Sequence, residues 1–266
     1  MPSESIIASL IFAAGKGSRM KNYHGNKTLL PLEPDQSPFE GTHPILLHIL
    51  ENLPPGPSAL VINHKKEDVI AATRNLGIQY FEQPELNGTG GALLASKSFI
   101  LDRDYDRLII TMGDVPFVKS STYMGLTEAL DYYPMVVLGF TPDDKKQYGV
   151  LEIMDDHVIR VTEWKYWSAY SKEKQDQLQI CNSGIYAARR DVLAGYIHIL
   201  EKKPHTVLKE RNGRMVTIEE FFITDLIELM NDDGLKIGYT IAEDEIEVMG
   251  IDDLTSLIKA QKLLNA

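Results

Sequence analysis

Apolar residues along this chain fall into short continuous runs that alternate with stretches of helical spacing. The first run, residues 6–12, is long enough for a strand that is buried on both faces. Strand and helix alternate in the first half, which predicts a parallel, doubly wound α/β sheet with helices on both faces. Further strands are predicted at residues 58–63, 79–83, 107–112 and 135–140, and helices at residues 44–53, 65–76, 92–99, 189–200 and 254–264.

Two stretches between these elements have a distinct composition. Residues 33–43 are rich in Pro, Asp, Ser and Gly and predict a surface loop. The helix that follows the second strand should direct Val69, Ile70 and Leu76 toward the core. Residues 144–179 are charged and rich in tyrosine, which favours a small lobe with short strands of its own.

The composition is that of an acidic globular protein. The chain has 266 residues, a formal net charge of −11 and a pI near 5.1, so nucleic acid and anionic membranes are not expected as partners. Cys181 is the only cysteine, which excludes an internal disulfide, and it is predicted to be small and buried. Because the sequence shows no cleavable leader and no long apolar run, a cytoplasmic location is expected.

A basic turn with two glycines follows the first predicted strand. Residues 13–20 read A-A-G-K-G-S-R-M, so backbone amides could surround a polyanion there. The P-loop pattern fails because Gly17 is followed by Ser18 and Arg19. The dinucleotide fingerprint fails because Met20 stands where it requires a third glycine. For the two glycines alone, a tight turn with a solvated basic edge is a sufficient explanation.

The whole turn resembles the signature of the sugar-phosphate nucleotidyltransferases, A-A-G-x-G-T-R-M, which a lysine follows after a spacer. Lys27 stands in the position of that lysine. Asn26 replaces the family's proline, which is expected to loosen the turn. The resemblance implies a Rossmann-like nucleotidyltransferase fold, a mixed and mainly parallel sheet, with Arg19 and Lys27 as catalytic residues. The nucleotide-binding residues that it implies in the turn are Ala13, Ala14, Gly15, Gly17 and Ser18.

A second motif concerns the base of the nucleotide. Residues 83–90 resemble the segment Q-A-E-Q-L-G-T-G of the uridyltransferases in this family, and Gln83, Gly88 and Thr89 match at the same spacing. The resemblance implies that these three residues face the uracil, and an amide side chain suits a base edge because it offers donors and an acceptor. A helix N-cap at Asn87 or Thr89 is compatible with that role.

Two aspartates are implied as magnesium ligands. Asp114 follows an apolar strand in a G-D-V-P segment, which places its carboxylate at the edge where open α/β sheets bind ligands. It matches the family's G-D-x-P aspartate, which holds Mg²⁺. Residues 246–254 resemble V-x-G-V-N-N, and Asp252 falls on the asparagine that is the second ligand. Asp253 is expected to cap the last helix.

The sugar-binding residues rest on three weaker matches. Gly149 lies in a segment that resembles G-Y-G, Glu163 and Lys165 resemble E-x-K, and Asn182 resembles the asparagine of N-T-G-I-Y. The carboxylate would accept from sugar hydroxyls, and the ammonium would meet the phosphate. An exposed pair on a strand is the simpler explanation of Glu163 and Lys165. Residues 216–230 resemble a structural helix of the family.

Together these motifs imply a magnesium-dependent enzyme that joins a sugar 1-phosphate to UTP and releases pyrophosphate. The closest match is the pyrophosphorylase domain of N-acetylglucosamine-1-phosphate uridyltransferases, so N-acetylglucosamine 1-phosphate is favoured over another hexose 1-phosphate. Without hexapeptide repeats, the acetyltransferase β-helix is expected to be absent. A single domain, residues 1–266, is expected, with nucleotide-binding and sugar-binding halves near residues 1–140 and 141–266. A cytidylyltransferase for an alcohol phosphate, a non-catalytic sugar-nucleotide-binding protein and a homo-oligomer all stay open.

Overall fold

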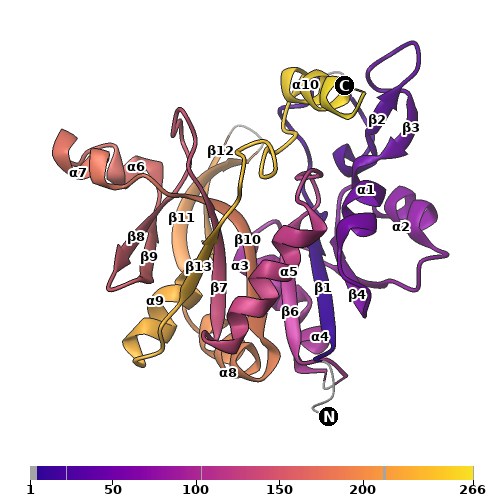
Figure 1. The fold of residues 1–266 in the computed structure, drawn as a ribbon. Coiled ribbons are helices and arrows are strands. Elements are labelled where there is room, and N and C mark those ends of the chain that lie inside the picture. Colours follow the sequence, from indigo (N-terminus) through magenta and orange to yellow (C-terminus); the bar gives the residue numbers. More distant parts are fainter. Residues whose placement is uncertain (1–4, 22, 103, 212–213, 266) are drawn as a thin grey trace.

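The computed structural model describes residues 5–21, 23–102, 104–211 and 214–265. A nine-stranded sheet forms its centre (Figure 1). Its strands are β1 (Ile7–Phe12), β4 (Ser58–Ile62), β5 (Gln79–Glu82), β6 (Arg107–Met112), β7 (Met135–Phe140), β8 (Val150–Met154), β9 (His157–Thr162), β10 (Cys181–Arg189) and β13 (Gly238–Ile241). The order is β13-β7-β10-β6-β1-β4-β5, with β8 paired to β10 and β9 paired to β8. Along this order the neighbours are parallel except where β10 joins β6 and β7, which confirms the predicted mixed, mainly parallel sheet.

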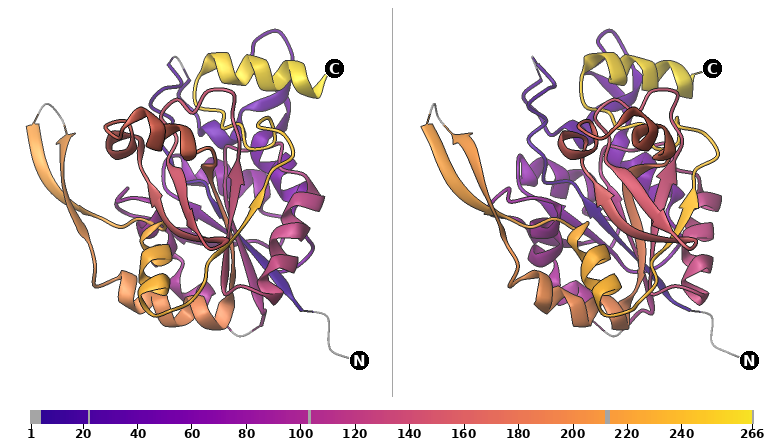
Figure 2. Two further views of the ribbon diagram at one scale, coloured as in Figure 1. Left: turned by 60° about the vertical axis from the view of Figure 1, so that its left-hand side comes forward. Right: turned by 90° about the vertical axis from the view of Figure 1, so that its left-hand side faces the viewer.

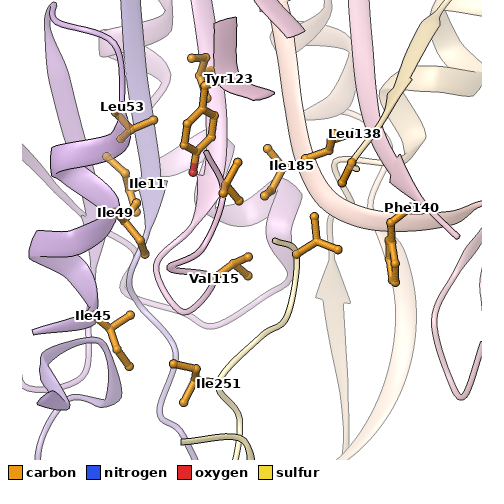
Figure 3. Close-up of a cluster of buried hydrophobic side chains, with 14 of the residues drawn as sticks. Ile11, Ile45, Ile49, Leu53, Val115, Tyr123, Leu138, Phe140, Ile185 and Ile251 are labelled. Atoms are coloured by element: carbon orange, nitrogen blue, oxygen red, sulfur yellow. The ribbon is translucent and has the colours of Figure 1, made fainter. Parts of the chain in front are cut away.

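Helices cover both faces of the sheet because successive side chains of each strand point to opposite sides. In β1, Leu10 belongs to one buried cluster and Ile11 to the other. Figure 3 shows the cluster around Ile11, where Ile49 of the first helix and Tyr123 of the fifth converge. The helices are α1 (Ile45–Asn52), α2 (Lys66–Thr73), α3 (Thr89–Ala95), α4 (Lys97–Leu101), α5 (Ser120–Glu128), α6 (Trp164–Trp167), α7 (Lys172–Gln177), α8 (Arg190–Leu200), α9 (Asp225–Asp232) and α10 (Leu254–Leu264), with short 3₁₀ helices η1 (Lys27–Leu29) and η2 (Ala129–Asp131).

The layers follow from these two clusters. Helices α1, α2, α5 and α10 contribute their buried residues to the cluster around Ile11, and α3, α4, α8 and α9 contribute theirs to the cluster around Leu10. The predicted strands and the helices that begin near residues 44, 189 and 254 are therefore confirmed. No helix within the described ranges is long and apolar enough to cross a membrane.

Two strand pairs stand outside the main sheet. The first, β2 (Pro31–Pro34) with β3 (Gly41–Pro44), includes both ends of the stretch 33–43. The prediction of a surface loop is therefore wrong at these ends, which are strands. Asp35, Ser37 and Pro38 lie between the strands, whereas Pro34 and Gly41 belong to β2 and β3, and α10 packs against β2. The second, β11 (His205–Arg211) with β12 (Arg214–Glu220), forms a ribbon that stands away from the body of the molecule (Figure 2).

Three helix predictions need correction. Helix α2 ends at Thr73, so Leu76 lies beyond it and is exposed instead of turned inward. The helix predicted at residues 92–99 is two short helices, α3 and α4, which meet at Ser96. The stretch 216–230 begins as the strand β12, whose residues alternate across the ribbon, and only its second half forms α9.

Cys181 lies at the start of β10 and is fully buried, as predicted. Burial raises the pKa of its thiol to about 11. A thiol that stays protonated near neutral pH is a poor nucleophile, because the thiolate is the reactive form. Cys181 therefore acts as a packing residue.

Candidate active site

One cavity of about 460 Å³ opens at the edge of the sheet where the parallel strands β1, β5 and β6 end. Ligands of open α/β sheets bind at this edge because the loops that leave the strands converge there. The cavity is lined by every residue that the sequence implies for nucleotide, metal or catalysis, namely Ala13, Ala14, Gly15, Gly17, Ser18, Arg19, Lys27, Gln83, Gly88, Thr89, Asp114 and Asp252.

An ion-pair cluster forms the floor of this cavity. The Lys27 Nζ donates to Asp114 Oδ2 at 2.5 Å and to Asp252 Oδ1 at 2.8 Å. The Arg19 Nη2 lies 2.8 Å from the same Asp252 oxygen. Burial lowers the pKa of Lys27, but the two carboxylates outweigh it and hold the pKa above its usual value. Two cationic and two anionic side chains therefore alternate within hydrogen-bonding distance of one another.

The backbone joins the two aspartate loops directly. The Ile251 amide donates to the carbonyl of Asp114 at 2.8 Å, so the loop after β6 and the loop before α10 are hydrogen-bonded side by side. Asp253 accepts from Ser256 N at 2.8 Å and caps α10 in a capping box, as predicted. The cap leaves Asp252 as the member of the pair that faces the cavity.

Asn26 fixes the position of Lys27, which contradicts the expectation that its replacement of proline loosens the turn. Its side chain is buried and its Nδ2 donates to the carbonyl of His64 at 2.7 Å. Its Oδ1 accepts from Thr28 N at 3.0 Å and from Thr28 Oγ1 at 2.8 Å, which caps η1. The amide therefore ties the turn of Lys27 to the loop after β4.

We expect Asn26→Ala to lower the free energy of unfolding by about 1–3 kcal/mol, because it leaves the His64 carbonyl and the Thr28 donors without their partner. Urea unfolding followed by circular dichroism measures this difference. Asn265→Ala is the matched control, since it removes one hydrogen bond of an exposed side chain at the end of α10. Equal losses in both variants would mean that the buried amide adds nothing to the fold.

The loop from Gln83 to α3 forms another wall. The Gln83 Nε2 donates to Asn87 Oδ1 and to the Gly88 carbonyl, both at 3.1 Å. Gly88 has a φ of 94°, and a Cβ there would lie 2.3 Å from the Phe221 carbonyl oxygen. Glycine is therefore required for steric and conformational reasons. The N-cap of α3 is Gly88, so the predicted N-cap at Asn87 or Thr89 is wrong.

The residues implied for the sugar lie elsewhere. Glu163 and Lys165 line a second cavity, of about 1010 Å³, between the β8–β9 side and the base of the ribbon. They lie at the start of α6, with Glu163 as N-cap, and so do not form a pair on a strand. Among the described residues, Gly149 and Asn182 line neither cavity. The backbone amide of Asn182 donates to the Gly149 carbonyl at 2.8 Å. Gly149 lies close to Glu163, because a Cβ built on this glycine would lie 3.5 Å from Glu163 Oε1.

The ribbon contributes residues that the motifs missed. Lys209 and Glu220, which form an ion pair across β11 and β12, line the first cavity. Phe222, just beyond β12, lines both cavities. The resemblance at residues 216–230 includes Glu220 and Phe222 but implies only a structural helix. Lys209 lies in a ribbon strand without the apolar pattern that marks a buried strand.

Comparison with known proteins identifies the family of this chain. Residues 9–193 match the model of the MobA-like NTP transferase domain, so the chain belongs to that family. The "Bifunctional protein GlmU" of Sphingopyxis alaskensis is 29% identical over 262 residues, which are 96% of this chain and 52% of the relative. The chain thus spans about half the length of the curated relatives that it matches.

Solved structures share the fold at lower identity. A protein assigned as a UDP-N-acetylglucosamine pyrophosphorylase from Entamoeba histolytica has a TM-score of 0.71 and 15% identity, with 98% of this chain and 81% of that chain covered. A protein assigned as a glucose-1-phosphate thymidylyltransferase from Bacillus anthracis has a TM-score of 0.66 and 20% identity, with 97% and 94% covered. At these identities the likeness establishes the fold alone.

Proposed function

We propose that this protein transfers a nucleotidyl group from UTP to a sugar 1-phosphate. An oxygen of the sugar phosphate attacks the α-phosphorus, a new P–O bond forms, and the bond to the β-phosphate bridge breaks with release of pyrophosphate. Such a reaction needs alignment and charge neutralisation more than a covalent nucleophile. The proposal rests on one observation. The four charged residues Arg19, Lys27, Asp114 and Asp252 line the same cavity as the turn that follows β1.

The two carboxylates at the base of the first cavity suit a hard divalent cation. Asp114 and Asp252 offer carboxylate oxygens, which Mg²⁺ prefers, and both already accept from the same ammonium of Lys27. When bound, Mg²⁺ neutralises phosphate charge and orients the oxygens of the triphosphate. Arg19, which is largely exposed, and Lys27, which is buried, would bind phosphate oxygens with their N–H donors.

The sugar phosphate would enter from the second cavity. Glu163 and Lys165 line it and supply an acceptor for hydroxyl groups and a cation for the phosphate. Because Phe222 lines both cavities, the two substrates would meet at this ring. The names of the relatives, a UDP-N-acetylglucosamine pyrophosphorylase and a glucose-1-phosphate thymidylyltransferase, favour hexose 1-phosphates, with N-acetylglucosamine 1-phosphate first. Gly149 lies beside Glu163, and its carbonyl accepts from the Asn182 backbone amide, so both residues belong to the segment that adjoins Glu163.

Gln83 favours uracil over cytosine. Since both neighbours of its Nε2 are oxygen acceptors, the amide is oriented with Oε1 away from them. The acceptor Oε1 complements the N3–H of uracil, whereas N3 of cytosine carries no hydrogen and would face it with a lone pair. The thymine of a thymidylyltransferase substrate shares the uracil pattern on this edge.

We expect Gln83→Leu to remove the preference for UTP over CTP. The ratio of kcat/KM for the two nucleotides should fall by roughly 10-fold or more, because a hydrogen bond that only uracil satisfies is lost. Gln79→Leu, on the exposed start of β5, should leave the ratio unchanged. Steady-state kinetics with both nucleotides measure the ratio, and a preference that survives Gln83→Leu assigns base selection to other residues.

The activity itself is tested by pyrophosphate release. UTP, dTTP, CTP and ATP are each combined with N-acetylglucosamine 1-phosphate, glucose 1-phosphate and an alcohol phosphate, with and without Mg²⁺. We expect release only with Mg²⁺ and fastest with UTP and a hexose 1-phosphate. Release with CTP and the alcohol phosphate would favour a cytidylyltransferase. Tight nucleotide binding without any release would identify a non-catalytic binding protein.

A further inference from the structure

A second group of metal-binding side chains lies outside the cavities, where β3 joins α1. His43 is the second-last residue of β3, and His48 and Glu51 lie three residues apart on α1. Residues at this spacing share one face of a helix. One ligand atom from each of the three residues, two imidazole nitrogens and a carboxylate oxygen, lies within 4.8 Å of the others.

The separations are close to those of a metal site. The His43 Nε2 lies 2.7 Å from His48 Nδ1 and 3.7 Å from Glu51 Oε2. A tetrahedral ion with bonds of about 2.0–2.2 Å holds its ligand atoms roughly 3.4 Å apart. The two rings are nearly perpendicular and are joined by one N–H···N hydrogen bond, whose proton an ion would replace. An ion in its place would need only rotations of the imidazoles and of the exposed Glu51 side chain, with release of that proton.

The backbone and the surroundings support this arrangement. His43 has a φ of 57°, in the left-handed region that residues other than glycine rarely occupy. Such a conformation costs on the order of 1–3 kcal/mol and is characteristic of functional sites. The His48 ring is only partly exposed and packs against both His43 and Phe117.

The chemistry of the three ligands selects the ion. Two imidazoles with one carboxylate suit Zn²⁺ or a similar late first-row ion, whereas Mg²⁺ prefers an all-oxygen set such as Asp114 and Asp252. Three protein ligands leave a fourth tetrahedral position for water.

The three residues adjoin the elements that carry Lys27 and Asp114. The Ile45 amide, at the start of α1, donates at 3.0 Å to the carbonyl of Leu30, the C-cap of the 3₁₀ helix that carries Lys27. The His48 ring packs edge-on against Phe117, three residues after Asp114, with ring centroids 6.0 Å apart. An ion bound here would therefore brace the supports of both Lys27 and Asp114.

We propose that His43, His48 and Glu51 form a Zn²⁺ site that is separate from the proposed magnesium site. The ion joins β3 to α1 and stiffens the elements that carry the catalytic side chains. This inference concerns residues outside the active-site cavity and is tested without any assay of turnover.

The test is calorimetric titration of the full chain with Zn²⁺ in the presence of about 10 mM Mg²⁺, which occupies hard oxygen sites. We expect one tight equivalent in the wild type, and its loss or at least a roughly 10-fold weakening in His43→Ala, His48→Ala and Glu51→Ala. His198→Ala, which changes an exposed histidine on α8, should retain it. The same ion should raise the Tm of the wild type and not that of the three variants.

Two further variants keep the outcome decisive. Glu51 is exposed, so Glu51→Ala tests the site even if His48→Ala does not fold. Asp114→Ala removes a carboxylate of the cavity and should retain the tight equivalent. Unchanged zinc binding in Glu51→Ala and His43→Ala, or loss of the equivalent in Asp114→Ala alone, would overturn the proposal.

Discussion

Replacement of Lys27 by methionine is expected to lower turnover by roughly 10²-fold or more, the effect of removing one preorganised group that stabilises developing charge. Methionine keeps the apolar stem of the side chain, which is buried, and removes only the ammonium. That ammonium contacts both Asp114 and Asp252 and lines the cavity that is proposed to hold the phosphates. Pyrophosphate release at saturating substrate measures the change.

Lys16→Met is the control for this variant. Lys16 belongs to the same turn and is exposed, but it does not line the cavity, so its loss should change turnover by less than about 3-fold. If Lys27→Met turns over at nearly the normal rate when Mg²⁺ is saturating, Lys27 has no catalytic role.

Asp252→Ala is expected to abolish most activity, again by roughly 10²-fold or more, because it removes an oxygen ligand and a partner of Lys27 and Arg19. Asp252→Asn should restore turnover to within about 10-fold of the wild type, since an amide oxygen can still ligate Mg²⁺. Comparison of the two variants across a Mg²⁺ titration separates a ligand from a purely electrostatic partner. A ligand role is contradicted if alanine and asparagine behave alike.

Asp253→Asn is the matched control for the neighbouring position. Its carboxylate caps α10 through Ser256, and asparagine is an equally good N-cap. Turnover and stability should therefore stay close to those of the wild type. A large loss of activity in this variant would exchange the roles assigned to the two aspartates.

The sequence predicts those parts of the molecule that depend on short stretches of chain. The apolar run of β1 and the turn after it are adjacent, so one segment specifies both a buried strand and a phosphate-binding loop. Asp114 follows β6 in the same way. Because the ends of parallel strands meet at one edge of a sheet, such local patterns are sufficient to bring distant residues into one cavity.

Other features depend on contacts that no local pattern shows. Asn26 appears in the sequence as a missing proline, yet its amide bonds to His64, 38 residues away. Lys209 and Glu220 reach the cavity because β11 and β12 pair with each other outside the main sheet. Residues 216–220 were predicted to be helical by resemblance, although cross-strand pairing with β11 makes them a strand.

The side chain of Phe222 links the two cavities. Its ring lines both cavities, so a ligand that displaces the ring in one of them changes the shape of the other. Thermodynamic linkage requires the effect to be mutual: if the first ligand changes the affinity for the second, the second changes the affinity for the first by the same factor. In the proposed reaction, the affinities for nucleotide and sugar phosphate would therefore be coupled through the side chain of Phe222.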